Sequence, residues 1–289
     1  MNFPKFWARG ESGAFFAWRW SSNSLQEAQI LANQAAREMR DRVRAGGDLD
    51  HHGAYYPNRP FREQVLREFQ NPSGEIDAVI TRNLYGCHVL NTARVMFVDI
   101  DFDDPWRSNP ATGSYGGGFF ARLFGKKPAT VSPPPPTPEE AALKKIENWT
   151  NTHPDWSWRV YRTRAGLRLL ATQGPVEADS PIATEVFDAL GADPLYRQLC
   201  KTQKCFRARL TPKPWRCGVE RAPARWPWTT PKREQNFLKW NEKYEATAVN
   251  FATCEFVRTV GREMIEPQLQ PIVTLHDDAT RAKSKLQLA

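Results

Sequence analysis

The sequence predicts an α+β fold built from antiparallel strands. Three short apolar segments, 76–82, 87–91 and 95–102, are joined by links short enough for hairpins. A second pair of strand-like segments, 156–163 and 167–172, is joined by a turn that contains a glycine. Segments with helical spacing of apolar residues lie before and after these strands, without the regular alternation that indicates a parallel sheet.

The N-terminal elements follow from local signals. Residues 15–20 are rich in aromatic residues and predict a strand. Ser22 or Ser24 then caps a helix whose apolar residues, from Leu25 to Val43, keep helical spacing. A proline at a first helical position predicts a short helix over 60–69.

The later elements are predicted in the same way. Thr137 caps a helix that runs to about Asn151, with proline at its first position and acids in its first turn. Further helices are expected at 182–190, 195–201 and 232–244, with strands at 206–210 and 250–257 and a polar C-terminal tail.

These elements suggest a catalytic-type core over residues 1–230 and a small helical and strand addition over 231–289. A segment rich in glycine and proline, at about 105–137, is expected to be an exposed insertion in the core.

Composition limits the class of protein. The 289 residues, 40% of them hydrophobic, are enough for a real core, and 11 tryptophans with 16 phenylalanines exclude a disordered chain. The chain opens on no signal peptide and has no apolar stretch that would cross a bilayer, so we expect no membrane partner. Five sparse cysteines favour a reducing, cytoplasmic setting. The net charge of +8 suits a polyanionic partner such as nucleic acid.

The strongest motif is the apolar run that begins at Val95 and ends in Asp99 and Asp101. On a strand these two carboxylates point to the same face. Two carboxylates that close repel each other unless a cation lies between them, and Mg²⁺ or Mn²⁺ prefers such oxygen ligands. The motif therefore predicts a metal site for phosphoryl or nucleotidyl transfer. The alternative is a strand end that is simply solvated.

A second motif is the turn between segments 156–163 and 167–172, which carries Arg164 and Arg168. Arginine binds phosphate in a bidentate manner, so these two residues are candidate ligands of a nucleoside triphosphate. Ordinary surface arginines are the alternative.

In this order the motifs resemble the archaeo-eukaryotic primase superfamily, which includes the primase-polymerases. The resemblance covers residues 76–217 and implies an RRM-like sheet, two metals and template-directed nucleotide joining. The superfamily has a histidine where this chain has Arg168, and arginine lacks the tunable pKa of histidine. The resemblance also implies a third acid, which is Asp193 or Asp188. Asp99, Asp101 and Asp193 would then hold the metal, although either candidate third acid could instead cap a helix.

A basic cluster follows, made of Arg207, Arg209, Lys213 and Arg216, with Phe206 and Trp215 between them. It is a candidate surface for the backbone and bases of a template. A solvated basic strand is the alternative. Nearby, Cys200, Cys205 and Cys217 lack the paired spacing of a zinc ribbon, and buried structural cysteines are expected.

The resemblance, together with these motifs, implies a DNA primase or primase-polymerase that uses Mg²⁺ or Mn²⁺, nucleoside triphosphates and a single-stranded DNA or RNA template. Such an enzyme would work with replication or repair partners. Two alternatives stay open, a catalytically silent relative that binds nucleic acid and a metal-dependent nuclease that uses the same carboxylates.

Overall fold

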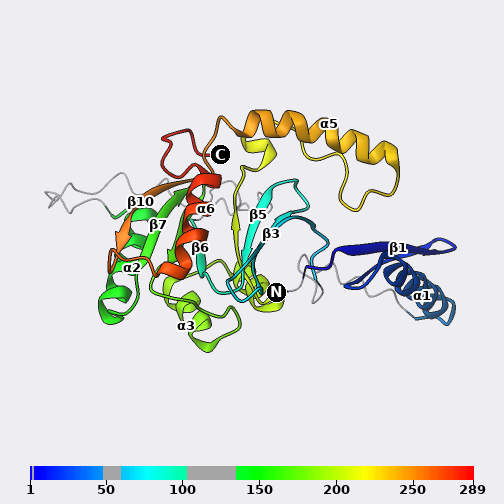
Figure 1. The fold of residues 1–289 in the computed structure, drawn as a ribbon, viewed down its shortest axis with the longest axis horizontal. Helices are drawn as coiled ribbons and strands as arrows, with labels where there is room; N and C mark the ends of the chain where they lie inside the picture. The colour runs from blue at the N-terminus through cyan, green and yellow to red at the C-terminus, as the bar shows by residue number, and fades with distance from the viewer. Residues whose placement is uncertain (2, 48–59, 103–134) are drawn as a thin grey trace, which may run out of the picture.

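The computed structural model describes residues 1, 3–47, 60–102 and 135–289, and it confirms an α+β protein with antiparallel sheets (Figure 1). The described residues form a two-stranded hairpin, two four-stranded sheets and six α-helices. None of the described helices has the length and apolar character needed to cross a membrane. The expected insertion at 105–137 lies almost entirely outside the described residues.

The N-terminal unit is a hairpin covered by one helix. It consists of β1 (Phe6–Ser12), β2 (Phe15–Ser21) and α1 (Leu25–Arg44), and the Ser24 side chain caps the helix by accepting from the Glu27 amide. Alanines on α1 pack against the hairpin. A side chain at Gly10 would lie 2.1 Å from the Ala32 backbone, so glycine permits this close approach. β1 is not predicted by any local sequence signal.

The second sheet has the order β3-β4-β5-β9. Its strands are β3 (Gln64–Gln70), β4 (Ile76–Arg82), β5 (His88–Thr92) and β9 (Phe206–Arg209). The helix predicted over 60–69 is therefore wrong, because these residues pair with β4 in an antiparallel register that runs from Gln64 opposite Arg82. Pairing across a sheet outweighs a weak local helix signal.

The third sheet, with the order β10-β7-β8-β6, carries the candidate site. Its strands are β6 (Phe97–Asp101), β7 (Trp158–Thr163), β8 (Gly166–Ala171) and β10 (Cys254–Val260). The expected hairpin between segments 87–91 and 95–102 does not form, because β6 pairs with β8 while β5 pairs with β4 and β9. Three helices flank these sheets, α2 (Pro138–Thr152), α3 (Pro181–Leu190) and α4 (Pro194–Gln203).

The C-terminal residues form α5 (Pro231–Ala248), the short helix η2 (Pro267–Leu269) and α6 (Gln270–Thr280). The prediction of a polar tail is wrong, since Ile272 and Val273 of α6 lie in the main core and Ala289 is buried. Because β10 and α6 belong to the same core as β6, residues on both sides of the expected boundary at 231 form one packed body.

Candidate functional site

The centre of the candidate site is an ion pair between neighbouring strands. Asp99 on β6 lies opposite Arg168 on β8. The Arg168 guanidinium donates from Nε to Asp99 Oδ1 at 2.7 Å and from Nη2 to Oδ2 at 3.1 Å. Its Nη1 donates to the carbonyl oxygen of Arg209 at 3.0 Å, which links the site to β9. Both donor edges of Arg168 are thus occupied by protein.

The two partners differ in exposure. The Arg168 side chain is 2% exposed, whereas the Asp99 side chain is 28% exposed. Burial lowers the pKa of Arg168, but the charge and hydrogen bonds of Asp99 more than offset this effect, and the pKa is raised above its usual value. Arg168 therefore stays charged and neutralises Asp99 from inside the protein.

Asp101 follows at the exposed end of β6. It lies opposite Gly166, where a Cβ atom would come within 1.9 Å of the Ile100 carbonyl oxygen. The glycine of the second motif is thus required for the close pairing of β6 and β8. Arg164, the other candidate phosphate ligand, is exposed at the turn that joins β7 to β8.

The structure separates the two candidates for the third acid. The Asp193 amide donates to the Asp99 carbonyl oxygen at 3.0 Å, so Asp193 lies beside β6. Its carboxylate caps α4 by accepting from the Tyr196 amide at 2.8 Å. Asp188 instead forms a surface ion pair with Arg197 and is 60% exposed.

These acids do not form a ready-made metal site. Both oxygens of Asp99 already accept from Arg168, and the Asp193 carboxylate caps a helix. Across residues 1, 3–47, 60–102 and 135–289, no three His, Cys, Asp or Glu side chains are grouped so as to hold a metal. As placed, these acids do not fit a pair of divalent cations, because the charge of Asp99 is neutralised by Arg168.

A polar network that the sequence analysis missed lies on the same face of the sheet, between β7 and α6. The Asp277 carboxylate accepts from Tyr161 Oη at 2.6 Å and from Arg159 Nη2 at 2.5 Å. His276 is fully buried, with its ring 4.7 Å from that of Tyr161 and 5.3 Å from that of Phe97. Burial lowers the pKa of His276 to about 4. In the sequence, the signal for this network is the adjacent pair His276 and Asp277, which lies in the segment expected to be a polar C-terminal tail.

The basic cluster predicted after Phe206 divides into a buried and an exposed part. Arg207 is 9% exposed, and its Nη2 donates to both oxygens of Glu63 at 2.8 and 2.9 Å. Its guanidinium also lies over the Phe61 ring. Arg209 is half-buried, and its Nε has no hydrogen-bond partner among the described residues. Arg207 as placed is therefore not available to a template.

The exposed part surrounds Trp215 in the short helix η1 (Pro214–Arg216). Trp215 is 41% exposed, with Lys213 Nζ 5.7 Å and Arg221 Cζ 5.2 Å from its ring centre. The Tyr85 ring meets its edge at 5.2 Å. We call the four residues Lys213, Trp215, Arg216 and Arg221 the Trp215 patch.

Buried contacts hold the loop before this patch in place. Tyr244 of α5 is fully buried and donates from Oη to the Pro212 carbonyl oxygen at 2.6 Å. Burial raises the pKa of Cys87, and this thiol donates to the same carbonyl at 3.4 Å. The patch is therefore presented on a rigid support.

All five cysteines are free and buried, including Cys200, Cys205 and Cys217.

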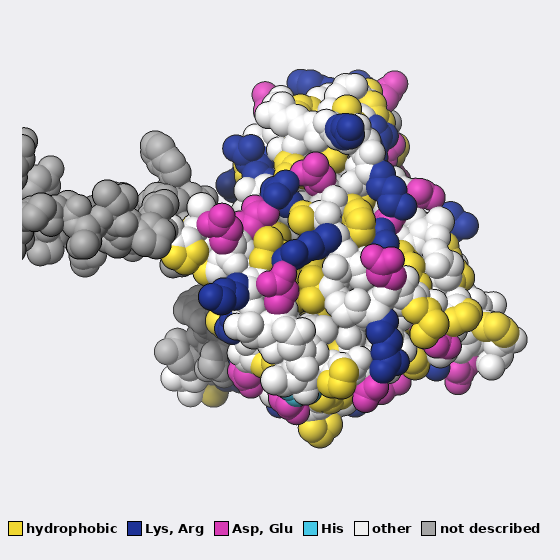
Figure 2. Space-filling model, turned by 90° about the vertical axis from the view of Figure 1, so that its left-hand side faces the viewer, with side chains coloured by type: hydrophobic (Ala, Val, Ile, Leu, Met, Phe, Trp, Pro, Cys, Tyr) yellow, Lys and Arg dark blue, Asp and Glu magenta, His cyan; other side chains and the backbone are white. Residues whose placement is uncertain are grey.

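Basic side chains are not concentrated everywhere on the surface. Figure 2 shows that the face on the left-hand side of Figure 1 mixes Lys and Arg with Asp and Glu.

Comparisons with protein-family models, with curated proteins and with solved structures found no match to this chain.

Proposed function

We propose that the chain is a single-stranded nucleic-acid-binding protein that uses the Trp215 patch. The observation that carries the proposal is an exposed tryptophan with two cationic side chains within 5.7 Å of its ring centre, on a chain with a net charge of +8. Aromatic rings stack on bases, and neighbouring cations attract the phosphates, without any need for a particular sequence. The function corresponds to a silent relative of the primase superfamily.

The internal neutralisation of Asp99 also supports binding without catalysis. A buried arginine on both oxygens of the central acid reduces the negative charge that would attract a divalent cation. Binding to nucleic acid should therefore not depend on Mg²⁺ or Mn²⁺.

The test is the affinity for a dye-labelled dT12 oligonucleotide, measured by fluorescence anisotropy with and without EDTA. Loss of a stacking platform weakens binding by roughly 1–3 kcal/mol, so we expect Trp215→Ala to bind about five- to hundredfold more weakly. Leu195→Ala is the matched control, because this apolar side chain is 52% exposed and belongs to another element, α4. Equal affinity of Trp215→Ala and the wild type would reject the patch as the interface.

Metal-dependent nucleotidyl transfer is a second candidate, favoured by one observation. Asp193 is distant from Asp99 in sequence, yet its amide donates to the Asp99 carbonyl oxygen, so the two acids lie on neighbouring segments, which supports a shared role. Nucleoside triphosphates, a template and replication or repair partners belong to this candidate.

Primer extension on single-stranded DNA with Mn²⁺ tests the second candidate. The informative variant is Asp101→Asn, because Asp101 is exposed, whereas a change at Asp99 would also leave Arg168 without its partner. Extension that Asp101→Asn abolishes would establish a polymerase, and shortening of the oligonucleotide would establish a nuclease. We expect no change in product length with either protein.

A further inference from the structure

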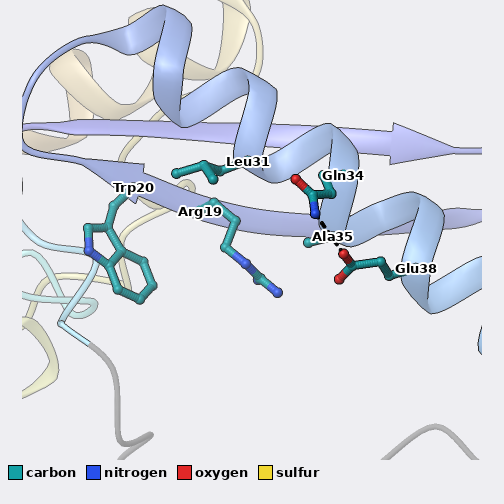
Figure 3. Close-up of a pocket in the computed structure, with 6 residues that line it drawn as sticks. All are labelled: Arg19, Trp20, Leu31, Gln34, Ala35 and Glu38. Carbon is teal, nitrogen blue, oxygen red and sulfur yellow. Dashed lines mark hydrogen bonds between the residues drawn. The ribbon is translucent and has the colours of Figure 1, made fainter.

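The N-terminal unit contains a groove of about 330 Å³ between β2 and α1. Arg19 and Trp20 of β2 line it, together with Leu31, Gln34, Ala35 and Glu38 of α1 (Figure 3). This groove belongs to the N-terminal hairpin and helix, whereas the candidate site lies on a four-stranded sheet and the Trp215 patch surrounds η1. Its volume is at the lower end of the range for small-molecule sites.

The lining combines a flat aromatic wall with an aliphatic one. Trp20 is held at 5.3 Å from the Trp7 ring, and Leu31 is 39% exposed although it is a large apolar residue. At the polar end, Gln34 Nε2 donates to Glu38 Oε1 at 2.9 Å, and Arg19 donates to the Trp18 carbonyl oxygen. In the view of Figure 3 the Arg19 side chain lies between Trp20 and Glu38. A flat ring with hydrogen-bonding atoms on its edge, such as a nucleobase, matches this combination.

The charge beside the groove favours an anionic occupant. The second half of α1 carries Arg37, Arg40, Arg42 and Arg44. In the same stretch of the helix the acids are Glu38 and Asp41, and Asp41 is paired with Arg40. With 3.6 residues per turn, Arg42 lies on the face of α1 that lines the groove, whereas Arg37, Arg40 and Arg44 lie on other faces. A phosphate that leaves the groove along the helix would thus meet Arg42.

The groove is also rigid. Ala28, Ala32 and Ala36 of α1 are fully buried, and the close approach of Ala32 to Gly10 holds the helix against the hairpin. A preformed platform avoids the loss of entropy that ordering on binding would require.

We propose that this groove receives one base of a single-stranded nucleic acid, stacked on Trp20, with a neighbouring phosphate on Arg42 of α1. The inference rests on the proposed nucleic-acid binding and adds to it a second contact surface. A strand that contacts both surfaces binds more tightly than either surface alone would allow.

The experiment measures dye-labelled dT12 binding to full-length Leu31→Asp and Ile30→Asp. Both residues are exposed on α1, at 39% and 58%, but only Leu31 lines the groove. The two variants therefore introduce the same charge into the same helix. We expect Leu31→Asp to weaken binding at least tenfold and Ile30→Asp to weaken it less than twofold.

A second variant, Trp20→Leu, keeps an apolar side chain against Trp7 and removes the stacking platform. We expect five- to hundredfold weaker binding, which corresponds to roughly 1–3 kcal/mol of stacking. The melting temperature of each variant shows whether the N-terminal unit remains folded.

The two proposals fail in different ways. If the wild type does not bind dT12, both are wrong. If it binds, and Trp215→Ala weakens binding while Leu31→Asp and Ile30→Asp bind alike, the groove is not a base site and the proposed function stands. The same conclusion about the groove follows if Trp20→Leu binds like the wild type.

Discussion

Two of the arginine–carboxylate pairs that join distant parts of the chain, one at each four-stranded sheet, differ in how their acids are exposed. In the Glu63–Arg207 pair both side chains are 9% exposed. In the Asp99–Arg168 pair the arginine is 2% exposed and the carboxylate is 28% exposed. The first pair is enclosed by protein on both sides, whereas the second presents its acid to solvent. The two pairs should therefore respond differently when one partner is removed, because a charge left in the interior costs more than a charge that reaches water.

The largest predicted effect is on stability and tests this asymmetry. Asp99→Asn leaves the buried Arg168 charge without a counter-charge, so we expect a loss of about 3–5 kcal/mol in the free energy of unfolding. Arg168→Met leaves a carboxylate that reaches water, and we expect a smaller loss of about 1–3 kcal/mol. Urea unfolding at pH 7.5, followed by circular dichroism, measures both.

The enclosed pair provides the control. Glu63→Gln and Arg207→Met should destabilise the protein by similar amounts, because the partner left behind is equally buried in each case. A larger loss for Arg168→Met than for Asp99→Asn would contradict the reasoning from exposure.

The two pairs also show what the sequence can predict. The D-x-D strand and the hairpin with Arg168 were predicted from local patterns, and the structure places Asp99 opposite Arg168. What the pattern could not show is that Arg168 is buried and pairs with Asp99, because the depth of a side chain depends on the elements packed over it. Here the Arg209 carbonyl on β9 completes its hydrogen bonds.

Arg207 shows the same limit in another form. Alternation along segment 206–210 predicts a face shared by Arg207 and Arg209, which is a candidate template surface. Glu63, the partner of Arg207, lies 144 residues earlier, in the segment 60–69 that was expected to be a helix. With that segment predicted as a helix, nothing in the sequence placed Glu63 beside Arg207. Trp215 and Lys213 were easier to place together because they are close in sequence.

The smaller predicted effect is a pH dependence that arises beneath the Asp99–Arg168 pair. Burial lowers the pKa of His276 to about 4, from a usual value near 6.5. The unfolded chain therefore binds a proton at a higher pH than the folded protein does. The contribution of this histidine is complete above pH 6.5 and is lost as the pH falls from 6.5 to 4, by roughly 2–3 kcal/mol.

His276→Gln tests this effect, since it removes the titrating group from a site that faces Asp277, Arg168, Cys254 and Asp99. We expect the free energy of unfolding of this variant to fall less than that of the wild type between pH 6.5 and 4. His153→Gln is the control, because His153 stacks on Trp149 with its side chain 33% exposed.

Other titrating groups add to the pH dependence. Burial also lowers the pKa of His88 to about 4, so His88 contributes in the same direction and should leave a residual slope in the variant. Below about pH 4 the lowered pKa of Asp277 adds a further loss in the wild type, which differs in the variant because His276 is one of the groups that lower this pKa. Identical slopes for His276→Gln and the wild type between pH 6.5 and 4 would mean that His276 binds its proton in the folded protein, and that the face around Asp99 is open to water.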